Sequence, residues 1–221
     1  TLDQQYASKL REVLAGVNTD WMYQPLHTGV GHKHSLFVEG GDKTMQYGIN
    51  LAYNRTQGVM KGSDRNTFSG AMTMAYRVKG FLFRNKLTID YNNSNNSPYG
   101  VFNTYYQMNP YSRLYDENGF LIKSYSYMNA TGSNGIYYNP LYNTTLNTKD
   151  NSTYTTITDN FYAEWQATDD IRVIGRFGIV NKQSTADIFK PANHTDFINQ
   201  SNVYRKGSYH QTNGKSTDIN A

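Results

Sequence analysis

Strict alternation of apolar and polar residues is the feature that most limits what this chain can fold into. In segment 46–54, QYGINLAYN, every second residue from Tyr47 to Tyr53 is large and apolar, and the residues between them are polar or small. Side chains of an extended strand alternate between its two faces, so the segment predicts a strand with one apolar and one polar face. Such an apolar face can contact either a protein core or membrane lipid.

The alternation recurs along the chain and predicts an all-β fold. We expect strands at 34–39, 45–57, 67–78, 81–92, 156–166 and 171–181, with a further strand beginning at Ser208 or Lys215. Before them, Tyr6, Leu10 and Val13 have helical spacing and precede Gly16, which predicts one short N-terminal helix. About six to seven strands are therefore expected, in an antiparallel up-and-down order.

The lengths of the connections favour a membrane barrel. The connections at 40–44, 79–80 and 168–170 are short, whereas those at 59–66, 93–153 and 182–206 are longer. In an antiparallel meander, all the short connections lie at one end and all the long ones at the other. Outer-membrane barrels show this asymmetry, with short periplasmic turns and long outer loops, so we expect part of a transmembrane barrel that contacts lipid.

Composition excludes several other classes of protein. The chain is only 38% hydrophobic, has a mean hydropathy of -0.71, and contains no apolar run long enough for a transmembrane helix. It has no cysteine, which excludes disulfides and thiolate metal sites. A net charge of +4 gives little reason to expect nucleic-acid binding, and Phe81 and Phe83 continue an apolar strand face rather than forming a base-stacking platform.

Segment 93–153 carries the best candidates for ligand contacts. It lacks sustained alternation, and its aromatic rings stand among Asn and Gln, a mixture suited to sugars or peptide backbones. Any single tyrosine here more often packs the loop, so the prediction applies to the group. The candidates are Tyr105, Tyr106, Asn109, Tyr111, Arg113, Tyr115, Tyr137, Tyr138 and Tyr142. Within the loop, Asp116 to Gly119 predicts the turn of a small hairpin, and Arg113, Arg172 and Arg176 are candidates for lining a polar lumen.

Neither a metal site nor catalysis is expected. His27, His32 and His34 form a weak metal-binding pattern that lacks a further ligand. Asp159 and Glu164 fall on opposite faces of their strand, and no nucleophile motif is present. We therefore predict no cofactor and no enzyme activity.

Ordered segments of the chain resemble the SusC/RagA-type TonB-linked outer-membrane transporters. The resemblance begins at NTDWMYQPLHTGVG and continues through the strand SLFVEGG and the loop GVMKGSD. It extends in the same order through NPYSRLYDENGFLIK, YNPLYNTTLNTKD, FYAEWQATDDIRVIGRFGI, PANHTDF and YRKGSYHQTNGKSTDINA. The signal sequence, the plug and the TonB-contacting segment of that family have no counterpart in these residues, so a fragment of the early barrel region is expected.

The resemblance implies a function and a topology. It implies import of glycan or peptide oligomers across the outer membrane of a Gram-negative bacterium, with TonB-derived energy and a SusD-like surface lipoprotein. The expected regions are an extracellular loop with a helix at 1–33, four strands at 34–92, an extracellular loop at 93–153, a strand hairpin at 154–181, an extracellular loop at 182–207 and the start of another strand at 208–221. A soluble secreted β-sandwich that binds carbohydrate through the same tyrosines is the alternative.

Overall fold

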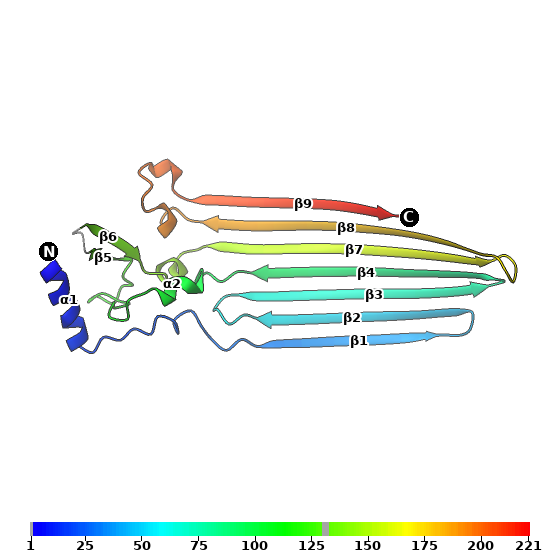
Figure 1. Cartoon of the computed structure of the whole chain (residues 1–221), viewed down its shortest axis with the longest axis horizontal. Coiled ribbons are helices and arrows are strands. Elements are labelled where there is room, and N and C mark those ends of the chain that lie inside the picture. The colour runs from blue at the N-terminus through cyan, green and yellow to red at the C-terminus, as the bar shows by residue number, and fades with distance from the viewer. Residues whose placement is uncertain (1, 130–132) are drawn as a thin grey trace.

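One long antiparallel sheet dominates the molecule (Figure 1). The computed structural model describes residues 2–129 and 133–221. The seven-stranded sheet has the order β1-β2-β3-β4-β7-β8-β9, and β5 and β6 form a separate two-stranded sheet. The strands are β1 (Gly31–Gly41), β2 (Met45–Gln57), β3 (Asp64–Val78), β4 (Phe81–Asn95), β5 (Ser124–Met128), β6 (Asn134–Tyr138), β7 (Lys149–Gln166), β8 (Arg172–Lys190) and β9 (Ser208–Asn220). The helices are α1 (Leu2–Leu14), α2 (Phe102–Tyr106) and the 3-10 turns η1 (Tyr142–Thr145), η2 (Thr195–Phe197) and η3 (Val203–Arg205). None of the described helices is long and apolar enough to cross a membrane.

The register places the apolar residues of neighbouring strands on one face, called the outward face here. Leu51 lies opposite Leu36 on β1 and Gly70 on β3, and one row of pairs continues through Ile89 to Ile157 on β7. Directly opposed residues share a face, so the alternation of each strand adds to that of the next. Polar pairs interrupt this face in places: Asn85 Nδ2 donates a hydrogen bond of 2.6 Å to Asp159 Oδ1, and Asn181 Nδ2 donates one of 3.0 Å to Thr217 Oγ1 on β9.

The polar face, called the inward face here, is concave. A hollow of about 720 Å³ reaches from Glu39 on β1 to Asn220 on β9, which means that the sheet curls towards its polar side. Arg84, Lys86 and Arg176 line this hollow. An apolar convex face and a polar concave face are the arrangement of a barrel wall with a wet interior.

Connections of different length lie at opposite ends of the sheet, as predicted. The β1–β2, β3–β4 and β7–β8 turns lie together at one end, and α1, α2 and the β5–β6 hairpin lie beyond the other (Figure 1). The β3–β4 turn consists of Lys79 and Gly80, whose φ angles of 44° and 83° are both positive. Two consecutive positive φ values define the type I′ turn, which matches the twist of a tight hairpin.

Several strands are longer than predicted, mainly at the end with the long connections, and β1 is longer at both ends. The predicted loop at 182–206 is wrong in its first part, because β8 continues to Lys190 between β7 and β9. Likewise, β7 begins at Lys149 rather than at 156. Backbone pairing extends through these polar residues, and Asn151 Nδ2 donates to Asn93 Oδ1 at 2.7 Å and to Asn95 Oδ1 at 2.8 Å. Alternation in apolarity cannot reveal strand segments that are polar on both faces.

Candidate ligand-binding site

Segment 96–148, called the loop unit here, folds around a small core to which Trp21, from before β1, also contributes. Trp21, Tyr105 and Leu141 are the buried hydrophobic side chains of the described residues, at 3%, 1% and 8% exposure. Trp21 Nε1 donates to the carbonyl oxygen of Asn109 at 2.9 Å, and the Tyr105 hydroxyl donates to the carbonyl oxygen of Tyr99 at 3.0 Å. The polar ends of these buried rings therefore find backbone partners, as buried polar groups generally do.

Buried polar side chains fix the turns around this core. Asn139 is completely buried, donates to the carbonyl oxygen of Ile122 at 2.8 Å and accepts from the backbone N–H of Leu141 at 3.0 Å. Ser112 is also buried, and its hydroxyl lies 2.7 Å from the hydroxyl of Tyr137 and accepts from Lys9 Nζ at 3.2 Å. Helix α1 is thereby attached to the loop unit, although the sequence alone does not indicate this contact.

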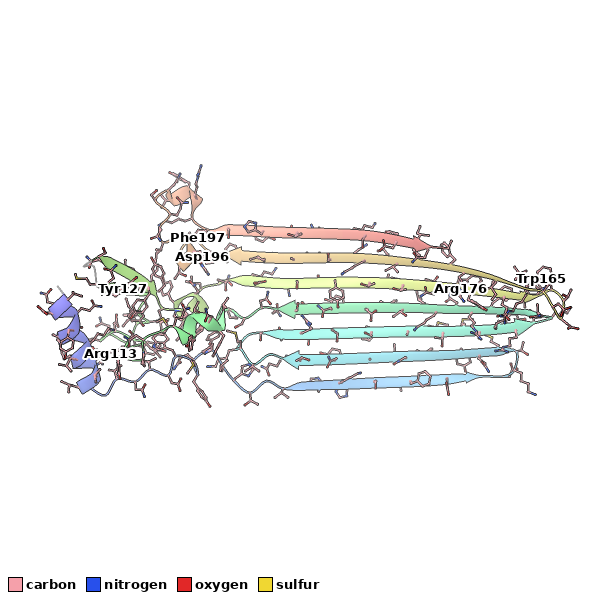
Figure 2. The ribbon with its side chains drawn as sticks, viewed as in Figure 1. Arg113, Tyr127, Trp165, Arg176, Asp196 and Phe197 are labelled. Atoms are coloured by element: carbon pink, nitrogen blue, oxygen red, sulfur yellow. The ribbon has the colours of Figure 1, made fainter. Side chains whose placement is uncertain are left out.

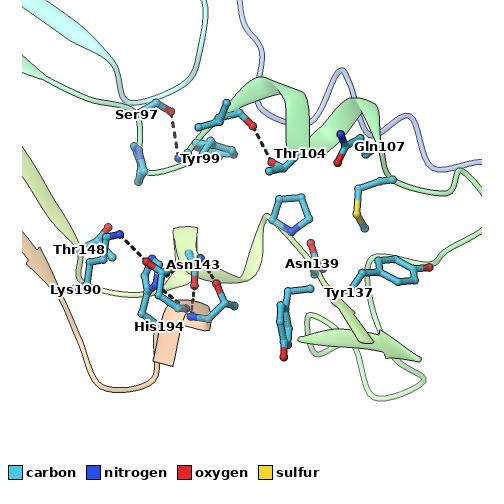
Figure 3. Close-up of a pocket in the computed structure, with 18 of the residues that line it drawn as sticks. Ser97, Tyr99, Thr104, Gln107, Tyr137, Asn139, Asn143, Thr148, Lys190 and His194 are labelled. Carbon is cyan, nitrogen blue, oxygen red and sulfur yellow. Dashed lines mark hydrogen bonds and ion pairs between the residues drawn. The ribbon is translucent and has the colours of Figure 1, made fainter. Parts of the chain in front are cut away.

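A pocket of about 820 Å³ lies between the loop unit and the ends of β7 and β8 (Figure 3). One wall comes from α1 and residues 97–109, a second from β5, β6 and the residues that follow them, and a third from 148–150 and 188–196. Its volume is in the range typical of small-ligand sites. Candidate residues Asn109, Tyr137 and Tyr138 line it, together with Gln5, Lys9, Gln107, Asn143 and His194.

The third wall is held by a hydrogen-bonded clamp. Asn143 Nδ2 donates to Thr195 Oγ1 at 2.7 Å, and Asn143 Oδ1 accepts from the backbone N–H of Thr195 at 3.1 Å (Figure 3). Next to it, His194 Nδ1 accepts from the backbone N–H of Asp196 at 3.2 Å, and Lys190 Nζ donates to Asp196 Oδ2 at 2.6 Å. Burial lowers the pKa of the His194 imidazole, Lys190 acts in the same direction, and the carboxylate of Asp196 opposes both.

Other groups that line the pocket are available to a ligand. In the described part of the chain, no hydrogen bond occupies the Tyr138 hydroxyl or the Gln107 amide, and both residues line the cavity. Tyr127 is 43% exposed and presents a ring that also contacts Tyr137. Rings next to free amide and hydroxyl groups can stack on a sugar or peptide plane and hydrogen-bond its edge.

The other candidate residues lie outside the pocket. Tyr105 belongs to the core, and burial together with nearby Tyr99 raises the pKa of its hydroxyl, so we assign it a structural role. Arg113 Nε donates to Glu12 Oε2 of α1 at 2.5 Å and does not join Arg172 and Arg176 on the inward face of β8 (Figure 2). The remaining candidates are Tyr106, Tyr111 and Tyr115, which are exposed on the loop unit, and Tyr142, whose ring lies 4.7 Å from Lys123 Nζ. The predicted hairpin turn is confirmed by the bridge between Tyr115 and Leu121.

Sequence reasoning missed the residues that come to the pocket from other parts of the chain. Gln5 and Lys9 belong to α1, and His194 follows β8. Asn143 lies in the predicted loop, but nothing in its local sequence marks it as the partner of Thr195.

The histidines of the first strand are close together without forming a metal site. The rings of His32 and His34 have centroids 5.3 Å apart on the outward face of β1. Across residues 2–129 and 133–221, no group of three or more His, Asp or Glu side chains is arranged to hold a metal ion.

Comparisons with known proteins agree with the resemblance seen in the sequence. Over 73 residues the chain is 32% identical to the TonB-dependent receptor SusC of Bacteroides thetaiotaomicron, and the match covers 33% of this chain and 7% of that receptor. The chain superposes on the structure of the RagAB peptide transporter with a TM-score of 0.69 at 15% identity, covering 92% of this chain and 23% of that one. The RagAB peptide importer in its closed-closed state gives a TM-score of 0.60 at 16% identity, over 80% and 20% of the two chains. No protein-family profile matches the sequence.

The superpositions concern the fold. The chain spans 23% or less of the length of each of these known proteins. Within that span, the predicted fold class is confirmed as part of an antiparallel up-and-down barrel wall with one short N-terminal helix.

Proposed function

We propose that this chain forms part of the wall of a barrel that imports nutrient oligomers across the outer membrane. The predicted resemblance to the SusC/RagA-type TonB-dependent transporters, which is confirmed, supports this role. The observation that carries the proposal is the seven-stranded sheet with an apolar convex face, a polar concave face and connections sorted by length. An apolar face that extends from β1 to β8 needs a nonaqueous partner, and outer-membrane lipid is the partner for which strands of this length are suited.

The long connections are proposed to lie outside the cell and to contact the imported oligomer. The pocket lined by Asn109, Tyr137 and Tyr138 is the proposed contact, and its mixture of rings and amides suits an oligosaccharide or a peptide. A SusD-like surface lipoprotein is proposed to deliver the oligomer, and TonB is proposed to supply energy through a plug segment. These partners are supported by the resemblance to SusC and RagA.

The soluble β-sandwich receives less support. A sandwich buries its apolar faces between two packed sheets. In the described residues, the second sheet is only the β5–β6 hairpin, and it lies beyond the end of the long strands (Figure 1). The apolar outward face is therefore left without a covering sheet.

The first experiment tests the location of the full-length protein in the cell. We expect it to sediment with outer membranes, to resist carbonate extraction and to show heat-modifiable migration on a gel. Release of a compact monomer into the soluble fraction would contradict the barrel and favour the sandwich.

A second experiment tests the pocket. In the purified full-length protein, Tyr138→Ala is expected to weaken binding of a malto-oligosaccharide or a mixed peptide digest by at least about fivefold, because stacking and a hydroxyl contact are lost. Tyr115→Ala is the matched control, since Tyr115 is exposed on the same loop unit away from the pocket. Equal effects of the two substitutions would contradict the assignment of the pocket.

A further inference from the structure

The inward hollow near the short turns contains a cluster of cations arranged around one aromatic ring. Tyr162 on β7 lies directly opposite Arg84 on β4 and Arg176 on β8. The two guanidinium carbons lie 5.6 Å and 5.7 Å from the centroid of the Tyr162 ring. A ring at this distance attracts a guanidinium group and restricts where it can point, so the two arginines are positioned as a pair. Lys86 lies in the neighbouring row, opposite Asn160.

Small residues form the floor of this hollow. Gly48 and Gly178 line it, together with Ala75. A Cβ atom on Gly178 would lie 2.9 Å from Asn160 Oδ1, and one on Gly48 would lie 2.9 Å from Thr73 Oγ1. Glycine inside a strand weakens it and often marks a place where a ligand or another backbone approaches closely. The side chains of Asn160 and Thr73 therefore pack closely over these glycines, and the hollow lies beside the cations.

No carboxylate of the described residues forms an ion pair with these cations. None of the ion pairs among the described residues involves Arg84, Lys86 or Arg176. The nearby carboxylate of Glu164 already accepts from the Tyr162 hydroxyl at 2.5 Å and lies 3.9 Å from Arg172 Nη1. The carboxylate that lines the hollow, Glu39, is at its far edge on β1.

We propose that Arg84, Lys86 and Arg176 form a binding site for an oxyanion, a carboxylate or phosphate group carried by a molecule on the inward side of the wall. Guanidinium groups bind such groups through two parallel hydrogen bonds, and the ammonium group of Lys86 adds a third donor. Gln46 and Asn160 also line the hollow and add amide groups. The site lies near the short turns, at the opposite end of the sheet from the loop pocket (Figure 2).

The test is calorimetric binding to the full-length protein in detergent. Tripolyphosphate and citrate serve as the phosphate and carboxylate probes, and neutral maltotriose serves as the uncharged probe. The Arg84→Gln/Arg176→Gln variant is expected to weaken binding of at least one anionic probe by about tenfold or more, because two charged donors are removed. The probe that binds more tightly to the unmodified protein identifies the preferred oxyanion.

The control variant carries the same charge change elsewhere. Arg65→Gln/Arg205→Gln removes one arginine from the end of β3 far from the hollow and one from η3, and it should leave anion binding within about twofold of the unmodified protein.

If the Arg84→Gln/Arg176→Gln variant does not fold, Arg84→Lys/Arg176→Lys keeps the charges but loses the paired hydrogen bonds, and binding should weaken by about threefold or more. The proposal is overturned if the unmodified protein binds neither anion, or if the control variants lose as much affinity as the site variants. Because binding is measured without transport, either result leaves the proposed transport function open to its own test.

Discussion

At the scale of residues, the tyrosines of the loop unit have two different roles. Tyr105 is 1% exposed and its hydroxyl is hydrogen-bonded to the backbone, whereas Tyr138 lines the pocket with its hydroxyl unoccupied in the described part of the chain. The sequence shows both as tyrosines among polar residues, and that pattern predicts the group without separating its members. The difference arises from Trp21 and Leu141, which are distant in sequence and pack around Tyr105.

The structural role of Tyr105 predicts graded effects on stability. Tyr105→Phe should destabilise the loop unit by about 0.5–1.5 kcal/mol through the lost hydrogen bond, and Tyr105→Ala by about 3–5 kcal/mol through the cavity. Trp21 fluorescence during urea unfolding measures the effect in a background in which Trp165 and any tryptophan outside these 221 residues are replaced by Phe. Comparable losses for the two substitutions would contradict burial of the ring.

His194 predicts that the η2 contact depends on pH. Because burial lowers its pKa in the folded state, the unfolded segment takes up the proton first as the pH falls. The contribution of neutral His194 to the stability of this segment is complete above the pKa of the unfolded state, about 6.5, and is lost as the pH falls through the pKa of the folded state. Hydrogen exchange of residues 194–198 should therefore be faster at pH 5.5 than at pH 7.5, after correction for intrinsic rates. His194→Asn keeps an acceptor for the N–H of Asp196 and should remove this dependence, so a dependence that persists in the variant would exclude His194 as its source.

At the scale of elements, alternation predicts a strand best where its two faces contact different surroundings. The predicted β2, 45–57, agrees with the observed Met45–Gln57 because its apolar and polar faces differ along most of its length. The extensions of β7 and β8 were not predictable in this way, since polar residues predominate on both of their faces, the adjacent Ile188 and Phe189 break the alternation, and cross-strand pairing maintains the strand.

Substitutions on the two faces of β2 test which face meets lipid. Leu51→Arg places a charge in the middle of the outward apolar face and should destabilise the full-length barrel by about 2–4 kcal/mol. Asn50→Arg, on the inward face of the same strand, should have a much smaller effect. The fraction folded on a heat-modifiability gel across a urea series measures both, and similar losses would mean that the faces are wrongly assigned.

The Asn85–Asp159 pair predicts strong coupling between two residues on the outward face. Either single substitution to Leu leaves one polar group without its 2.6 Å partner in an apolar setting and should lower stability. The double substitution Asn85→Leu/Asp159→Leu removes both polar groups and should be neutral or stabilising. A double-mutant cycle in the same urea assay checks this, and additive effects would show that the pair does not act as a unit.

At the scale of the whole molecule, the separation of short and long connections predicts how the chain is oriented. Single cysteines placed in these 221 residues are informative because the segment has none of its own, provided that any cysteine elsewhere in the full-length protein is replaced by Ser. Asn118→Cys, in the hairpin turn of the loop unit, should react with a membrane-impermeant maleimide in intact cells. Asp169→Cys, in the β7–β8 turn, should react only after the outer membrane is permeabilised. The reverse labelling pattern would mean that the short turns, and not the loop unit, face the outside of the cell.

The general architecture could be predicted from the sequence, but the composition of the pocket could not. Strand order follows from alternation and connection length, both of which can be read in short segments. The pocket brings Lys9, Tyr138 and His194 together from three distant parts of the chain. Only the segment rich in rings and amides was recognisable in the sequence, because its composition is local.

The separate core of the loop unit has a consequence for the order of assembly. Pairing β4 with β7 requires closing a connection of roughly fifty residues, which costs about 2–3 kcal/mol more in chain entropy than closing a turn of two or three. A connection that has already folded brings its ends together, as the hydrogen bond of 2.9 Å between the N–H of Asn96 and the carbonyl oxygen of Asp150 illustrates. We therefore expect the loop unit to fold early and to act as a template on which the two halves of the sheet join, which then completes the pocket.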